Sequence, residues 1–322
     1  MSEEHWSERP EGGGWFAIWL IRTIGLRCGR PVARLCLYPI TLYFFFRRGY
    51  ERRVSYAFLE RAFGKKASAW QVMRHIHRFA STILDRVFLL AERYARFDVR
   101  VEGLGELDSR MRPERGVLLL GSHLGSFEVL RVLAADRPDV KVCAVLDTQK
   151  TPALTALLHA LNPEVARNVI DGSRPGTEIV LALGEALHEG ALATLLADRA
   201  RDHEATVVVD FMGSPAAFPT APFLIASLLK VPVVLCFGLY RGGNRYDLYF
   251  EPFADELALP RRARKTELRA VAQRYAARLE HYVHEDPYNW FNWHDFWNLE
   301  GFRDDADAVA DRDLAGSVSR GV

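Results

Sequence analysis

The sequence predicts an α/β fold with a mixed, largely buried sheet flanked by helices, preceded by an apolar helical segment at the N-terminus. First, short apolar runs alternate with stretches of helical periodicity between residues 99 and 250. Second, several runs, such as residues 116–121, are continuously apolar, as expected for strands covered on both faces. Third, residues 15–50 contain long apolar runs interrupted by arginines, unlike the rest of the chain.

The elements are predicted in chain order from the period of the apolar residues. Mixed polar and apolar positions at three- and four-residue spacing predict a helical lead-in over 55–94. Strands are expected at 99–103, 116–121, 140–146, 191–196, 206–211, 231–237 and 246–250. Helices are expected from near Ser126 and at 151–161, 177–188, 223–229 and 261–284.

The composition excludes some classes of protein. Lys and Arg total 42 against 41 Asp and Glu, a net charge of +1, which argues against a generally cationic nucleic-acid binder. The four cysteines form no CxxC pair and no zinc-ligand spacing, so we expect reduced thiols and no metal. The first fourteen residues are acidic, polar and glycine-rich, which does not resemble a secretory signal. From the cysteines we expect a cytoplasmic compartment.

The N-terminal segment has two apolar runs, residues 15–21 and 35–46, with arginines between and after them. At ~1.5 Å per residue the second run spans about 18 Å, short of the ~30 Å hydrocarbon core of a bilayer. We therefore predict a helix or helical pair lying in the membrane interface. A helical hairpin packed on the domain is the alternative, and both arrangements can hold together.

Three regions are predicted along the chain. Residues 1–50 form the membrane-associated segment, and residues 51–303 form the main domain. Residues 304–322 are acidic and rich in Ala, Gly and Ser, which is typical of a disordered tail.

The most informative segment for chemistry is 121–130, which begins where an apolar strand ends. His123 falls in the turn after that strand, and open α/β sheets place their sites at such ends. Glu128, on the first turn of the next helix, is expected to hydrogen-bond one imidazole nitrogen and leave the other as a proton acceptor. The helix N-terminus is also expected to offer backbone N–H groups to an anion. On spacing alone, a loop histidine and a solvated glutamate remain the alternative.

Three ordered motifs give the chain a resemblance to a known family. His-x4-Glu at 123–128, directly after a glycine-flanked strand, resembles the first motif of the lysophospholipid acyltransferase superfamily. Its glutamate form is similar to that of the bacterial lipid A lauroyl/myristoyl acyltransferases. Residues 195–199 end a buried strand with Asp198 and Arg199, and residues 211–220 resemble a Gly-x-Pro-x-x-Phe-Pro segment. The resemblance covers residues 15–297.

The resemblance implies a glycerol-3-phosphate acyltransferase-like fold and transfer of a fatty-acyl group. The donor would be an acyl carrier protein or acyl-CoA thioester, and the acceptor a hydroxyl or amine of a lipid or glycolipid. The reaction would take place at the cytoplasmic face of the cell inner membrane, without a metal or cofactor. His123 would be the general base, oriented by Glu128. The implied substrate-binding residues are Ser122, Ser126, Lys150, Asp198, Arg199, Gly213 and Phe218.

For several of these residues a structural role is an open alternative. Asp198 and Arg199 also fit a salt bridge at a strand end, and Gly213 and Phe218 also fit a tight loop. The sequence departs from the lipid A enzymes at Ser122, where they carry asparagine, and at residues 145–151, where only Lys150 supplies a positive charge. These departures argue against lipid A itself as acceptor.

The aromatic segment 289–297 resembles that of acyltransferases associated with polyene-pigment biosynthesis. From its composition alone we expect core packing against the sheet, with an acyl-tunnel wall or an interfacial belt as alternatives. His75, on the helical lead-in, is expected to be solvated or to cap a helix.

Two other functions compete with acyl transfer. An acyl hydrolase is disfavoured because the chain has no Gly-x-Ser-x-Gly nucleophile elbow. A non-catalytic membrane-binding protein on an acyltransferase scaffold is disfavoured because both His123 and Glu128 are present. Replacing His123 by alanine distinguishes an enzyme from a binding module.

Overall fold

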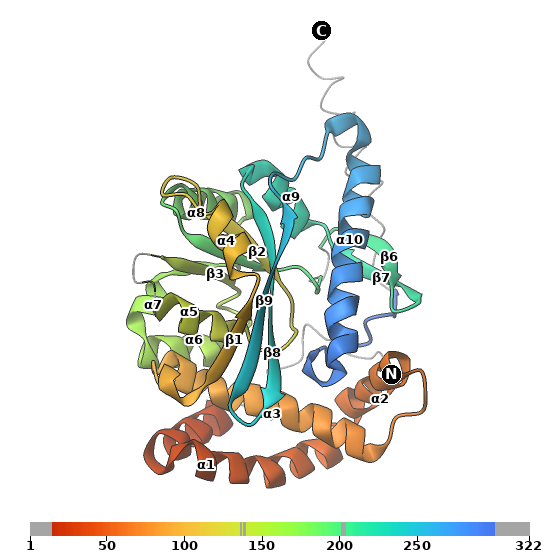
Figure 1. Cartoon of the computed structure of the whole chain (residues 1–322). Coiled ribbons are helices and arrows are strands. Elements are labelled where there is room, and N and C mark those ends of the chain that lie inside the picture. The colour runs from red at the N-terminus through yellow and green to blue at the C-terminus, as the bar shows by residue number, and fades with distance from the viewer. Residues whose placement is uncertain (1–14, 136, 138–139, 201–203, 300–322) are drawn as a thin grey trace.

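The computed structural model describes residues 15–135, 137, 140–200 and 204–299. Within them, seven strands form one mixed sheet in the order β1-β9-β8-β2-β5-β3-β4 (Figure 1). Their bounds are β1 Asp98–Glu102, β2 Val117–Gly121, β3 Val142–Leu146, β4 Val169–Asp171, β5 Leu192–Leu196, β8 Val233–Gly242 and β9 Arg245–Ala254. Neighbouring strands are parallel except for the antiparallel β8–β9 hairpin. The predicted α/β fold class is confirmed.

The sheet is covered on both faces, as the continuously apolar runs predict. Leu118 and Leu120 of β2 point into one core, whereas Val117 and Leu119 point into the other. The first core is closed by α8 (Gly176–His188), α9 (Ala221–Leu229) and α10 (Arg264–Glu285). The second is closed by α4 (Leu104–Arg110) and α5 (Leu130–Ala135). Two further helices, α6 (Pro152–Leu161) and α7 (Pro163–Arg167), connect β3 to β4.

One expected strand lies outside the main sheet. Residues 206–211 do form a strand, β6 (Thr206–Phe211), but it pairs with β7 (Ser214–Pro219) in a separate two-stranded sheet. Figure 1 shows this hairpin beside α10, away from the seven strands. The apolar pattern of 206–211 arises because Val207, Val209 and Phe211 pack into the core that α10 covers. Periodicity reports burial, and it does not report which strand is the partner.

Within the residues described, three α-helices precede the first strand of the sheet. They are α1 (Trp15–Arg47), α2 (Gly49–Phe63) and α3 (Ala69–Leu90). The first helix is broken at Gly29, whose φ of 83° and ψ of 165° are not helical, so it is a pair of helices. A capping box starts α3: Ser68 and Gln71 satisfy each other's backbone N–H groups. Figure 1 shows α1 running beneath α3 along one end of the molecule.

A buried ion pair attaches α1 to the domain. The Arg30 guanidinium donates to both carboxylate oxygens of Asp85 on α3 at 2.7 Å, and Asp85 is fully buried. The Tyr246 hydroxyl of β9 also donates to Asp85, at 2.9 Å. Apolar contacts of Ala33 and Leu37 with α3 lie alongside. The apolar segment therefore packs on the domain, as the hairpin alternative expects.

No helix in the described part of the chain is both long and apolar enough to cross a membrane. The predicted disordered tail, 304–322, lies outside the described residues. The division of the chain at residue 50 stays a prediction.

Replacing Asp85 by alanine should lower the free energy of unfolding by about 3–5 kcal/mol, because it leaves the Arg30 charge buried without its counter-ion. Urea unfolding followed by circular dichroism measures this. The matched control is Asp98→Ala, since the Asp98–Arg100 pair is more than half exposed and should change stability by less than about 1 kcal/mol. Equal effects of the two variants would contradict a special role for the buried pair.

Candidate active site

Two adjacent strand ends bring His123 and Asp198 together. Strands β2 and β5 are parallel, and Gly121 is in register with Leu196 as the last residue of each. His123 and Asp198 each follow two residues later, so their side chains start from equivalent positions at the carboxyl edge of the sheet. Ligand sites of open α/β sheets lie at this edge.

The Asp198 carboxylate is buried and receives three N–H groups. Its Oδ1 lies 2.9 Å from Nδ1 of His123. Its Oδ2 accepts the backbone N–H of His123 at 3.0 Å and the indole N–H of Trp290 at 3.1 Å. Asp198 is 1% exposed, so these donors replace the water that would otherwise solvate its charge.

The surroundings determine where the proton of the pair lies. Burial raises the pKa of Asp198, but His123, its hydrogen bonds and the Arg199 charge outweigh burial and bring that pKa to about 2. An ionised carboxylate only accepts, so Nδ1 of His123 is the donor and Nε2 is the free acceptor. Burial, followed by the charge of Arg199, lowers the pKa of His123 despite the raising effect of Asp198. The imidazole is therefore neutral at pH 7, with 33% of its side chain exposed.

Glu128 does not make the hydrogen bond to His123 that the sequence analysis expects. Its carboxylate lies 2.7 Å from Nε of Arg86 on α3 and accepts the Ser126 hydroxyl at 3.3 Å. Two features explain the difference. Residues 127–129 form a 3₁₀ turn in place of a first α-helical turn, and Arg86 offers a charged partner that local spacing cannot reveal. Asp198 makes the imidazole hydrogen bond that the sequence analysis expects of Glu128, and it does so at Nδ1.

The turn that carries His123 is pressed against β8. Gly125 has a φ of +73°, and a Cβ there would overlap the carbonyl oxygen of Gly238. A Cβ on Gly238 would in turn overlap the carbonyl of Ser126. The N–H of Ser126 donates to the Gly238 carbonyl at 2.8 Å, and the N–H of Gly125 donates to Asn289 at 2.8 Å. With the His123 N–H held by Asp198, these three N–H groups of the turn are already engaged. The anion site expected at the helix N-terminus, which begins at Phe127, stays a prediction.

The remaining expected substrate-binding residues are spread around this centre. Ser122 is buried next to the Tyr275 phenol, and Lys150 is exposed on the turn after β3, at the same edge of the sheet. Arg199 donates to the Phe291 carbonyl at 3.2 Å. Their parts in binding stay predictions.

Gly213 and Phe218 belong to the β6–β7 hairpin. Gly213 is exposed at its tip with a φ of +74°, as a tight turn requires. Phe218 is fully buried, with its ring edge-on to Phe211 and Tyr275. This placement fits the tight-loop alternative for Gly213, whereas Phe218 is a core residue of β7.

The aromatic segment frames the site. The N–H of Phe291 donates to the His123 carbonyl at 2.9 Å, and Leu124 pairs with Trp290 in an antiparallel bridge. The Asn289 side chain both accepts from and donates to the backbone of Tyr240 on β8, at 2.8 and 3.1 Å. The composition predicts the core packing but not these polar contacts.

His75 corrects another expectation, because it is fully buried. Its Nε2 lies 3.0 Å from the Trp290 carbonyl and its Nδ1 lies 2.8 Å from the Ser55 hydroxyl. A carbonyl only accepts, so Nε2 carries the proton and Nδ1 accepts from Ser55. Burial, partly offset by the Trp290 hydrogen bond, lowers the pKa of His75 to about 4, so this histidine is a neutral support for the segment.

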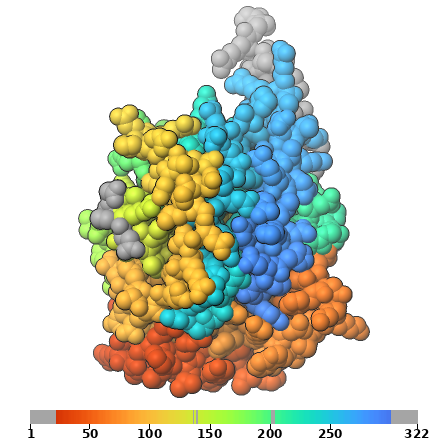
Figure 2. Space-filling model, viewed as in Figure 1, coloured from red at the N-terminus to blue at the C-terminus, as the bar shows by residue number. Residues whose placement is uncertain are grey.

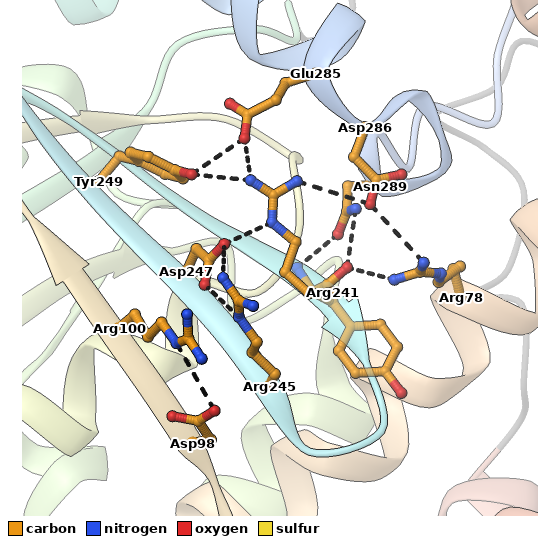
Figure 3. Close-up of polar contacts among 11 residues, drawn as sticks. Arg78, Asp98, Arg100, Arg241, Arg245, Asp247, Tyr249, Glu285, Asp286 and Asn289 are labelled. Atoms are coloured by element: carbon orange, nitrogen blue, oxygen red, sulfur yellow. Dashed lines mark hydrogen bonds and ion pairs between the residues drawn. The ribbon is translucent and has the colours of Figure 1, made fainter.

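A charged cluster anchors the start of the aromatic segment (Figure 3). Arg241 on β8 pairs with Asp247 on β9 at 2.8 Å and with Glu285 at the end of α10. Asp286 lies 3.9 Å from Arg78 on α3. The Arg241 pairs fasten the end of α10 to the β8–β9 hairpin, four residues before Asn289. Among the described residues, no group of three or more His, Cys, Asp or Glu side chains is placed to hold a metal ion.

The architecture and the site define an α/β protein with a partly exposed histidine paired to a buried aspartate at the carboxyl edge of its sheet. The family model described as bacterial lipid A biosynthesis acyltransferase matches residues 6–298, and the chain belongs to this family. It is accordingly an acyltransferase of lipid biosynthesis. The resemblance noted from the three motifs is confirmed.

Two other comparisons accompany this match. The crystal structure of the 1-acyl-sn-glycerophosphate acyltransferase PlsC from Thermotoga maritima is similar, with 16% identity and a TM-score of 0.37. That similarity covers 78% of this chain and 94% of the Thermotoga chain. No curated protein matches the sequence significantly.

The protonation state of His123 can be measured directly. In protein labelled with ¹⁵N-histidine, an NMR titration should show the pKa of His123 below 6.5, with the proton of the neutral ring on Nδ1. In Asp198→Asn the pKa should fall further, because the carboxylate that favours the imidazolium is gone. The variant His123→Gln assigns the resonance. A His123 pKa at or above 6.5 would contradict this description of the site.

Proposed function

We propose that this protein transfers a fatty-acyl group from an acyl carrier protein thioester, or from acyl-CoA, to a hydroxyl or amine of a lipid or glycolipid acceptor. His123 acts as the general base. The observation that carries the proposal is the pairing of Nδ1 with Asp198, which leaves a neutral, partly exposed imidazole with Nε2 available. The family match supports the reaction class.

The step requires no nucleophile from the protein. Nε2 of His123 removes the proton of the acceptor hydroxyl or amine as its oxygen or nitrogen attacks the thioester carbonyl. The tetrahedral intermediate collapses, the C–S bond breaks, and the imidazolium returns the proton to the departing thiolate. The products are the ester or amide and the free thiol, and His123 is again neutral. Asp198 orients the ring and stabilises its charged form while the proton is held.

We assign Glu128 a positioning part in this reaction. Through Arg86 and Ser126 its carboxylate links the loop after His123 to α3, and it is 9% exposed. Arg86 also contributes to lowering the pKa of His123. Glu128 partly neutralises that guanidinium, which favours the imidazolium needed in the transition state.

The site adjoins α3 through the Arg86–Glu128 pair, and α1 packs on the same helix. We propose that the end of the molecule formed by α1 lies on a lipid surface. Along one side of α1, apolar side chains recur at helical spacing and are 44–72% exposed. They are Val32, Leu35, Tyr38, Leu42, Tyr43 and Phe46. Exposed Arg27 and Arg47 flank them, as in helices that lie in the interface of anionic membranes. Figure 2 shows that the red-to-orange N-terminal helices make up one end of the surface. We place this end on the cytoplasmic face of the inner membrane.

Acyl transfer from radiolabelled acyl carrier protein into total membrane lipid extract tests the proposal. Wild-type protein should label a discrete lipid, and His123→Ala should lower the rate of labelling by about 10²–10⁴-fold. Asp198→Asn should lower the rate of labelling by a similar factor, because the imidazole loses the charge that orients it. Glu128→Gln should lose less, about tenfold, since it acts through Arg86. A folded Glu128→Gln as inactive as His123→Ala would instead make Glu128 the orienting carboxylate.

The same assay separates the competing functions. Label released as free fatty acid, with none in lipid, would identify an acyl hydrolase. Folded protein that binds vesicles but transfers no label from donors of several chain lengths would identify a binding scaffold. Repeating the assay with acyl-CoA distinguishes the two donors.

Membrane docking is tested by sedimentation with vesicles containing anionic phospholipid. The double variant Leu35→Glu/Phe46→Glu should reduce the bound fraction at least about tenfold, because two exposed apolar groups on the α1 face become charged. The control Leu181→Glu/Leu228→Glu changes side chains that are 66% and 68% exposed on other helices and should bind as the wild type does. Equal loss in both variants would argue against α1 as the docking face.

A further inference from the structure

Trp290, in the aromatic segment, is hydrogen-bonded through its side chain to the carboxylate of the reacting pair. Its indole N–H donates to Oδ2 of Asp198 at 3.1 Å, while Oδ1 of the same carboxylate holds Nδ1 of His123. Trp290 is fully buried. Its ring lies edge-on to Phe58, Phe211 and Phe296, which restricts the direction in which the N–H can point.

The backbone of Trp290 is held as firmly as its ring. Its carbonyl accepts a hydrogen bond from Nε2 of the buried His75. Trp290 also pairs with Leu124, on the His123 turn, in an antiparallel bridge. The preceding residue, Asn289, is bonded through its side chain to the backbone of Tyr240. The donor therefore reaches Asp198 from a support that joins the His123 turn to α3, through His75, and to β8, through Tyr240.

We propose that Trp290 is a positioning residue for catalysis: its indole N–H fixes the plane of the Asp198 carboxylate and keeps the proton of His123 on Nδ1. The inference rests on the proposed part of His123 as general base. Without the indole, Oδ2 keeps only the backbone N–H of His123, and the carboxylate can turn about its Cβ–Cγ bond. A turned carboxylate would no longer align Nε2 with the acceptor.

The indole also weakens the attraction between the Asp198 carboxylate and the His123 imidazolium. The charged groups that act on His123 are Asp198 and Arg199, just after β5, and Arg86 on α3. The Tyr275 phenol on α10 lies near Asp198. A hydrogen bond to a carboxylate disperses its negative charge and weakens its attraction for an imidazolium. Removing the Trp290 donor should therefore raise the pKa of His123, the opposite direction from removing the Asp198 charge.

The test compares Trp290→Phe with Trp297→Phe. Trp297 is the matched control because it lies in the same segment and its indole N–H donates to a neutral carbonyl, that of Phe211, at 3.1 Å. In Trp290→Phe, NMR titration should show the pKa of His123 raised by about half a unit. The kcat for acyl transfer should fall about tenfold while KM for the donor changes less than about twofold. In Trp297→Phe the His123 titration and kcat should match the wild type.

An unchanged His123 titration in folded Trp290→Phe would overturn the inference. The titration needs no activity, so it decides about Trp290 even if the protein transfers no acyl group. If the variant does not fold, the same inference can be tested by an NMR titration of the wild-type protein. The indole N–H resonance of Trp290 should shift as His123 titrates, because both share one carboxylate, whereas that of Trp297 should not. A Trp290 resonance that ignores the titration would equally contradict the proposal.

Discussion

The buried charge of Asp198 is the constraint on which the rest of the site depends. A carboxylate that is 1% exposed is tolerated only where donors replace its solvation, and here three N–H groups converge on it. Two come from the His123 turn after β2 and one from the aromatic segment near the C-terminal end of the domain. Satisfying this one group therefore ties together the sheet edge, the turn and the segment that crosses it.

The charged cluster around Arg241 belongs to the same construction (Figure 3). The aromatic segment begins directly after α10, so the position of the helix end sets the position of the indole. Arg241 holds that end through Glu285, and Asp247 on the neighbouring strand holds Arg241. This partly exposed network holds the helix end from which the segment with the buried donor continues. Burial of the aromatic rings stabilises the segment and restricts the direction of the indole N–H.

The sequence predicts the fold because the alternation of buried strands and helices repeats over most of the chain. It also identifies His123, since a histidine just past a buried strand has a definite place in an α/β sheet. It does not reveal that Asp198 is the partner, because that depends on β5 lying next to β2 in register. Glu128 is five residues away in sequence and looked closer, yet Arg86 on a separate helix takes its carboxylate.

His75 and Trp290 show a second limit of the sequence. A polar side chain on a mixed helix reads as solvated unless one knows that Ser55 and a carbonyl satisfy both of its nitrogens. An aromatic-rich segment likewise reads as core, and its polar atoms are then overlooked. Both errors share one cause: hydrogen-bond partners distant in sequence leave no periodic pattern in the sequence.

The close approach of Gly125 to Gly238 limits how this chain can be engineered. Each glycine is where it is because the backbone of the other strand or turn occupies the space a side chain would need. Neither can be enlarged, and since both already lack a side chain, no change at one can make room at the other. The His123 turn and the middle of β8 therefore form a single transplantable unit. A chimera that exchanges one with a relative must carry the other with it.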